Sequence, residues 1–88
     1  MITRKQRVNE IVRKLEAAGL HPGGGGYPIN PSEEVAYSAA FQRGVNWAFQ
    51  AACRGEELAP MAEFPGPTVD SAGQFDGWNA AIDALNED

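Results

Sequence analysis

The chain has 88 residues but a single cysteine, Cys53, and a single histidine, His21. One cysteine excludes a disulfide within the chain, so the sequence predicts a reducing, cytoplasmic setting. One cysteine and one histidine are too few for a structural zinc site, and neither CxxC nor HxxxH occurs. We therefore predict no metal ion or other cofactor. Cys53 is expected to be a small core residue, and His21 a residue at a helix end.

Long apolar runs are also missing, so no stretch of the sequence can span a bilayer. The first residues, MITRKQRVNEIVRKLEAAG, are amphipathic and lack the apolar core of a secretory signal. Hydrophobic residues make up 43% and charged residues 22%, which is ordinary for a globular protein. A chain of this length suits one domain with a thin core that buries about 60–65% of its unfolded surface. We expect one domain, residues 1–88, without a membrane partner.

Positive charge is scarce beyond residue 26. Residues 1–26 carry five Lys or Arg and two Glu, a net charge of +3, whereas residues 27–88 carry two Arg and ten acidic residues, a net charge of −8. Because neutralisation of phosphates by basic side chains drives most nucleic-acid affinity, direct nucleic-acid binding by this body is not expected. An acidic body is steered toward basic surfaces of other proteins. The alternative interpretation is that the acidity serves solubility alone.

Apolar periodicity predicts an all-α fold of three helices with a long central one and Gly/Pro-rich connectors. Their approximate bounds are residues 3–19, 31–54 and 70–86. Thr3 and Gln6 match a capping box at the first helix, and Gly19 stands where a left-handed residue follows a helix end. Asn30 or Ser32 is expected to cap the second helix.

Small residues at i+4 spacing run along the second helix and form a shallow groove into which another helix can pack closely. This row consists of Ala36, Ala40, Gly44, Ala48 and Ala52. The third helix carries an apolar seam with a/d-like spacing, formed by Phe75, Trp78, Ile82 and Leu85. We expect Gly77 to leave room for the indole of Trp78.

Between the first two helices lies HPGGGGYPINP, residues 21–31. A phosphate loop of the GxxxxGK[ST] type needs a preceding strand and a following Lys-Ser/Thr, both of which are missing here. The stretch is therefore interpreted as a Gly/Pro hinge between a basic N-terminal helix (residues 1–20) and an acidic helical body (residues 32–88). So small a helical domain hardly provides the cleft that acid–base chemistry needs, so we predict no catalytic residues.

Residues 38–84 carry two short motifs, FQRG at residues 41–44 and FDGWNAA at residues 75–81. This pattern resembles the ribosome modulation factor family of small, two-helix bacterial proteins. In that family an aromatic-x-Gly-Trp segment packs the second helix on the first. The resemblance therefore implies a helical hairpin in which Gly44 and Trp78 are packing residues.

The sequence departs from that family in three respects. The family's helices are strongly basic and bind ribosomal RNA, whereas residues 27–88 are acidic. The stretch from Gly44 to Gly55 is about one turn longer, and Ala59 stands before Pro60 where the family has a cysteine. The resemblance thus implies the hairpin framework, turned toward a protein partner rather than toward RNA.

Three function hypotheses follow. The first is a non-catalytic protein-binding regulator or inhibitor, similar in size and acidity to phage-encoded inhibitors of host machinery such as anti-CRISPR proteins. Its expected site combines acidic and aromatic side chains, namely Glu33, Glu34, Tyr37, Trp47, Glu56, Glu57, Glu63 and Asp70. The second is a ribosome- or RNA-associated factor that uses the basic face of the first helix, namely Arg4, Lys5, Arg7, Arg13 and Lys14. The third is a purely structural or homo-oligomeric module that needs only the small-residue row and the apolar seam, for example a homodimer built on that row.

Overall fold

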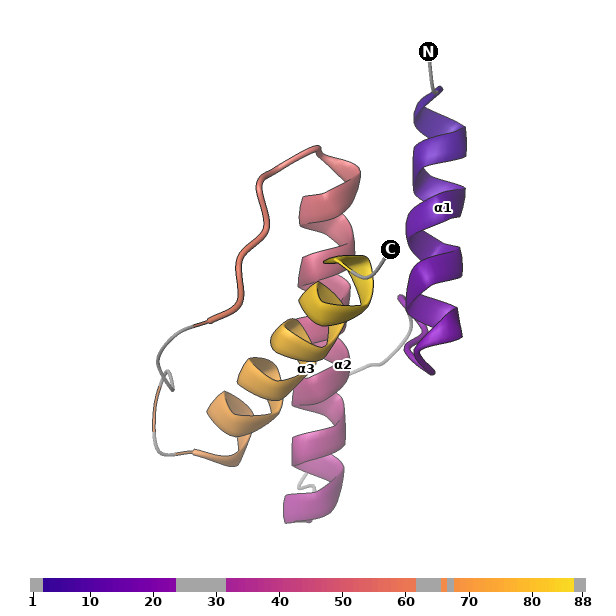
Figure 1. Cartoon of the computed structure of the whole chain (residues 1–88). Coiled ribbons are helices and arrows are strands. Elements are labelled where there is room, and N and C mark those ends of the chain that lie inside the picture. Colours follow the sequence, from indigo (N-terminus) through magenta and orange to yellow (C-terminus); the bar gives the residue numbers. More distant parts are fainter. Residues whose placement is uncertain (1–2, 24–31, 62–65, 67, 87–88) are drawn as a thin grey trace.

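Three helices make up the computed structural model shown in Figure 1. It describes residues 3–23, 32–61, 66 and 68–86. Within these ranges the elements are α1 (Arg4–Ala17), α2 (Glu33–Cys53) and α3 (Val69–Asn86), and no strand occurs. The predicted all-α fold with a long central helix is therefore confirmed.

Helix α1 lies one or two residues inside its predicted bounds because both of its ends are capped. The Thr3 hydroxyl accepts a hydrogen bond from the Gln6 amide at 3.1 Å, and the Gln6 side chain accepts one from the Thr3 amide at 2.9 Å. This confirms the predicted capping box. After the helix Gly19 has a φ of +79°, and the Leu20 amide donates to the Leu15 carbonyl at 2.8 Å. These features define a Schellman motif, which is the predicted stop.

Helix α2 begins at Glu33 rather than at the predicted residue 31. Ser32 is its N-cap, since the Ser32 hydroxyl accepts a hydrogen bond from the Val35 amide at 3.3 Å. At the other end the left-handed backbone of Gly55, with a φ of +77°, repeats the Schellman stop of α1. The helix therefore ends at Cys53, one residue before the predicted bound.

Helix α3 begins at Val69, one residue before the predicted start. The Thr68 hydroxyl accepts a hydrogen bond from the Ser71 amide at 3.1 Å, so Thr68 acts as the cap. The sequence analysis did not assign this role to Thr68.

Helices α2 and α3 cross obliquely, run in the same general direction and touch backbone to backbone (Figure 1). The antiparallel hairpin that the resemblance implies is therefore wrong, because α3 begins beside the start of α2. We call the two helices the α2–α3 pair. A Cβ atom placed on Gly44 would lie only 2.7 Å from the Trp78 amide nitrogen. Ala40 and Ala48, one turn to either side, are fully buried. The small-residue row of α2 is therefore a close-packing groove, as predicted, and α3 of the same chain fills it.

The expected role of Gly77 is wrong. A Cβ atom on Gly77 would overlap the backbone carbonyl of Phe41, and one on Gly73 would lie 2.6 Å from the Tyr37 carbonyl oxygen. These glycines make room for the backbone of α2 and not for an indole. The Trp78 indole is only partly buried and donates to the carbonyl of Ala59 at 2.9 Å.

Helix α1 runs beside α2 in the opposite direction (Figure 1). Leu15 is its only buried residue and joins a core cluster that includes Val45 and Ile82. Ile11 and Leu20 pack against this cluster while partly exposed. The contact of α1 thus depends on side chains, whereas α2 and α3 meet through their backbones.

Gln42 of α2 holds the segment that follows α1. The Gln42 amide group donates to the carbonyls of His21 and Gly23, the latter at 3.2 Å. The Gly23 amide donates to the Asn46 side chain at 2.6 Å. Residues 24–31, the rest of the predicted hinge, lie outside the described residues.

Candidate protein-binding surface

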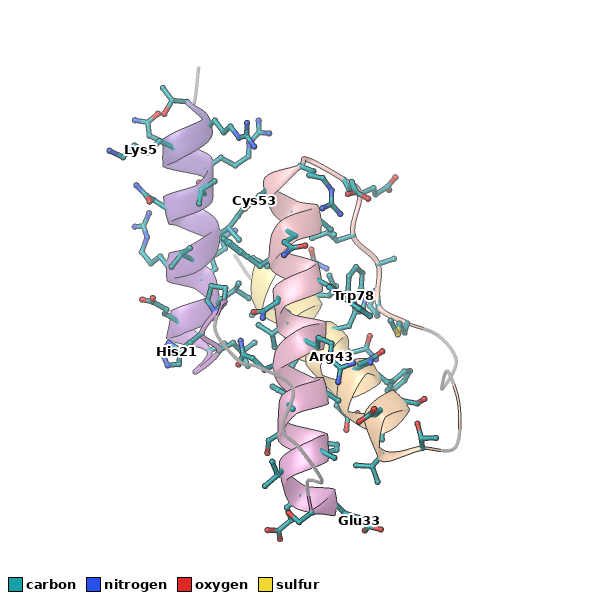
Figure 2. The ribbon with its side chains drawn as sticks, turned by 180° about the vertical axis from the view of Figure 1, so that it is seen from behind. Lys5, His21, Glu33, Arg43, Cys53 and Trp78 are labelled. Atoms are coloured by element: carbon teal, nitrogen blue, oxygen red, sulfur yellow. The ribbon has the colours of Figure 1, made fainter. Side chains whose placement is uncertain are left out.

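Acidic side chains gather where α2 and α3 begin. Glu33 and Glu34 occupy the first turn of α2, and Asp70 occupies that of α3. Tyr37 lies one turn along α2 and donates its hydroxyl hydrogen to the carboxylate of Asp76 on α3. Figure 2 labels Glu33 at this end of the molecule. We call this surface the acidic end and define it as Glu33, Glu34, Tyr37, Asp70 and Asp76.

An open concavity of about 480 Å³ lies between the two helices at the acidic end. The described residues that line it are Glu33, Glu34, Tyr37, Ser38 and Val69, none of which is basic. The negative potential of these carboxylates is therefore directed toward solvent without a neutralising charge in the lining. The same carboxylates also complement the positive ends of the α2 and α3 dipoles, so they stabilise the helix starts as well.

The Tyr37 side chain bridges the two helices at this concavity. Its hydroxyl group donates to Asp76, and its ring centroid lies 6.3 Å from that of Phe41 with the planes tilted by 36°. The hydrogen bond to Asp76 raises the pKa of Tyr37, and burial and the negative charge of Asp76 raise it further. The phenol is therefore held neutral, in one orientation, beside the carboxylates.

Glu56 and Glu57 lie at the other end of α2 and do not join the acidic end. They line a groove of about 600 Å³ between α1 and the other two helices, which we call the α1 groove. Arg7 and Lys14 of α1 line the same groove. Arg54 forms an ion pair with Glu56. These two carboxylates therefore have basic side chains of their own chain nearby.

Trp47 is also not part of the acidic end. Trp47 lies on α2, 14 residues after Glu33, which corresponds to about 21 Å along the helix axis. Its side chain is 44% exposed, as expected for a contact residue, but it stands apart from the carboxylates. Glu63 lies outside the described residues.

The basic residues of α1 point in more than one direction. Arg7 and Lys14 line the α1 groove. Arg13 lines a separate, open concavity together with Gln6 and Asn9. Lys5 points away from α2 and α3 (Figure 2). The structure therefore does not gather the predicted RNA-binding residues on a single face.

Cys53 and His21 are not brought together. Figure 2 shows Cys53 near the last turn of α2, whereas His21 lies beyond the C-terminal end of α1. Burial raises the pKa of the Cys53 thiol, while the charges of Arg4 and Arg54 act in the opposite direction. Within the part of the chain that the structure describes, no three His, Cys, Asp or Glu side chains are placed to hold a metal ion.

Asp76 is the member of the acidic end that the sequence analysis missed. It stands 39 residues after Tyr37, and only the oblique crossing of α2 and α3 brings the two side chains into contact. No local spacing or motif carries this information.

The chain matches no protein-family model, no curated protein and no solved structure. None of the helices, as far as the structure describes them, combines the length and apolarity needed to cross a membrane.

Proposed function

We propose that this chain is a non-catalytic protein-binding regulator whose acidic end binds a basic surface of another protein. The observation that supports this is an open concavity that Glu33 and Glu34 line and whose described lining residues include no basic one. Two further carboxylates belong to the same end, Asp70 in the first turn of α3 and Asp76 in the hydrogen bond with Tyr37. Such a concentration of one charge sign accelerates encounter with a surface of the opposite sign. Tyr37 adds an aromatic side chain with a polar end, and tyrosine is enriched at protein interfaces.

The partner class that we infer is a protein whose basic surface binds nucleic acid. Carboxylates at the acidic end would occupy the positions that phosphates take in such a site, so binding would exclude the nucleic acid. The net charge of −8 over residues 27–88 supports this class, because it favours basic partners over nucleic acid itself. We propose in particular a phage-encoded inhibitor of host machinery, of the anti-CRISPR type.

Affinity capture from a bacterial lysate tests the proposal. Glu33→Gln/Glu34→Gln removes two carboxylates from the acidic end, and Glu16→Gln/Asp83→Asn removes two exposed carboxylates elsewhere. We expect the wild type and the second variant to retain the same protein at low salt and to release it at high salt. The first variant should retain about three to ten times less of it, since each exposed charge pair contributes modestly.

The captured protein is then purified, and its affinity for nucleic acid is measured with and without the chain. We expect the wild type to compete with nucleic acid and Glu33→Gln/Glu34→Gln to compete less. Equal retention by the two double variants, or no retained protein at low salt, would contradict the proposal.

A ribosome- or RNA-associated factor of the ribosome modulation factor type is the second candidate. The observation that favours it is that Lys5 and Arg13 are exposed on α1, with Lys5 directed away from the rest of the chain. This candidate predicts co-sedimentation with ribosomes at low salt that Lys5→Gln/Arg13→Gln abolishes. A homodimer through the small-residue row would have to displace α3, and sedimentation equilibrium tests for it.

A further inference from the structure

A second surface of the α2–α3 pair, distant from the acidic end, is covered by α1. We propose that this surface binds a basic amphipathic helix of a partner protein, and that α1 is an internal occupant which the partner helix replaces. We call the surface the α1 face and define it as Val45, Phe49, Glu56, Glu57 and Leu85. The inference uses none of the residues of the acidic end.

The centre of the α1 face is apolar. Val45 is 1% exposed and belongs to the same core cluster as Leu15 of α1. Phe49 and Leu85 pack against this cluster while partly exposed. Release of α1 would expose these side chains to water, so the α2–α3 pair needs a helix with an apolar stripe at this place.

The rim of the α1 face is acidic, and in the described part of the chain the cations of α1 do not form ion pairs with its carboxylates. Glu56 and Glu57 line the α1 groove opposite Arg7 and Lys14. Glu56 forms its ion pair with Arg54 and not with a cation of α1, and the Lys14 ammonium group donates instead to the Leu85 carbonyl at 3.5 Å. The groove of about 600 Å³ that remains between them shows that α1 leaves part of the site unfilled.

Helix α1 itself shows which chemistry the site accepts. It presents the apolar side chains of Ile11 and Leu15 to the α2–α3 pair. Arg7 and Lys14 lie beside this apolar stripe. The replacing helix therefore has an apolar stripe flanked by Lys or Arg side chains that reach Glu56 and Glu57. This differs from the acidic end, which would bind a basic surface without inserting a helix.

The attachment of α1 is also the weaker of the two helix contacts in the fold. Its only buried side chain is Leu15, with Ile11 and Leu20 partly exposed beside it. Its polar contacts are the hydrogen bond from Lys14 to the Leu85 carbonyl at 3.5 Å and those of the following segment with Gln42 and Asn46. The α2–α3 crossing is instead a close backbone contact. Local opening should therefore release α1 while the α2–α3 pair stays folded. A partner helix would bind the small open fraction, so its apparent affinity rises in proportion to that fraction.

A fluorescently labelled peptide with the sequence of residues 3–20 is the probe, and it is titrated with the full chain. Leu15→Ala and, separately, Gln42→Ala loosen α1 in the full chain. We expect each variant to bind the peptide at least about tenfold more tightly than the wild type, because α1 is released more often. A peptide of the same composition in scrambled order should not bind.

Two charge variants, made in the loosened chain, locate the peptide. Glu56→Gln/Glu57→Gln should weaken its binding by about three to ten times. The matched change at the acidic end, Glu33→Gln/Glu34→Gln, should leave binding unchanged.

Three outcomes would overturn the proposal. In the first, neither loosened variant binds the peptide more tightly than the wild type although circular dichroism shows that both stay folded. In the second, the two charge variants weaken binding equally, which would mean that net charge alone attracts the peptide. In the third, the loosened chain forms a dimer in sedimentation equilibrium, which would assign the α1 face to a second copy of α1. None of these outcomes depends on the lysate partner of the acidic end, so the two proposals fail separately.

Discussion

At the scale of single residues, Gly77 sets the distance between α2 and α3 because glycine has no side chain. A methyl group there would overlap the Phe41 carbonyl, and no flexible side chain can yield to relieve it. We expect Gly77→Ala to lower the free energy of unfolding by about 1–3 kcal/mol through overpacking. This would occur even though alanine is the better helix former by about 1 kcal/mol. Urea unfolding measures the change.

The control for this prediction is Asp83→Ala, an exposed position on the same helix. It should leave the free energy of unfolding within about 0.5 kcal/mol of the wild-type value. If Gly77→Ala is as stable as this control, the two helices do not meet at the distance seen here.

The Tyr37–Asp76 hydrogen bond gives a pH-dependent prediction. Because the folded state raises the pKa of Tyr37 above its ordinary value of 10.0, this group contributes stability that is fully present below pH 10. The contribution is lost as the pH rises through the folded-state pKa. Urea unfolding should therefore show that the wild type loses more stability above pH 10 than Tyr37→Phe does. Identical alkaline losses would mean that the bond to Asp76 does not form in solution.

At the scale of elements, α1 is held less firmly than the α2–α3 pair. Leu15 is the only buried residue of α1, and deletion of a buried leucine side chain costs about 2–5 kcal/mol. We expect Leu15→Ala to lower the hydrogen-exchange protection of α1 amides at least about tenfold, while α3 amides keep theirs. Hydrogen exchange measured by mass spectrometry on peptic fragments reports the protection of α1 and of α3 separately. A parallel loss in both regions would show that the chain opens as one unit.

The sequence predicts the helix ends well because each end depends on residues within one turn. Thr3 with Gln6, and Gly19 with its left-handed backbone, are both found as expected. Two helix starts differ from their predictions: α2 begins at Glu33 instead of residue 31, and the Thr68 cap shifts the start of α3 by one residue. The partner of each helix face is a different problem, because it depends on chain topology. The close-packing row of α2 was therefore predictable, whereas the matching role of Gly77 was not.

The candidate site, too, is predictable from the sequence only where the signal is local. Glu33 and Glu34 carry a local signal, since acidic residues favour the start of a helix. Their grouping with Asp76 depends on the crossing of α2 and α3. The separation of Glu56 from this group depends on where α1 packs, which the charge pattern alone does not determine.

At the scale of the whole molecule, charge is divided between α1 and the rest. Residues 1–26 carry +3 and residues 27–88 carry −8, so α1 is attracted to the α2–α3 pair over a distance longer than any single contact. The acidic residues of the α2–α3 pair, in turn, repel one another. Salt screens both effects, and it should therefore act on the two units in opposite directions.

This division yields a salt-dependent prediction. Raising sodium chloride from about 10 mM to about 1 M shortens the Debye length from about 30 Å to about 3 Å. We expect the protection of α1 amides to fall by about three to ten times. The α3 amides should keep or gain protection, because repulsion within the α2–α3 pair is screened. Hydrogen exchange at the two salt concentrations measures both.

A matched pair of variants separates the local charges at the α1 groove from the overall attraction. Arg7→Gln/Lys14→Gln removes two cations that line the groove, and Lys5→Gln/Arg13→Gln removes two that do not. Both variants have the same net charge. If the carboxylates of Glu56 and Glu57 attract α1 through the groove, the first variant should lose most of the salt dependence and the second should keep it. Equal losses in the two variants would mean that only net charge holds α1, and the acidic rim of the α1 face would then have no special role in choosing a helix.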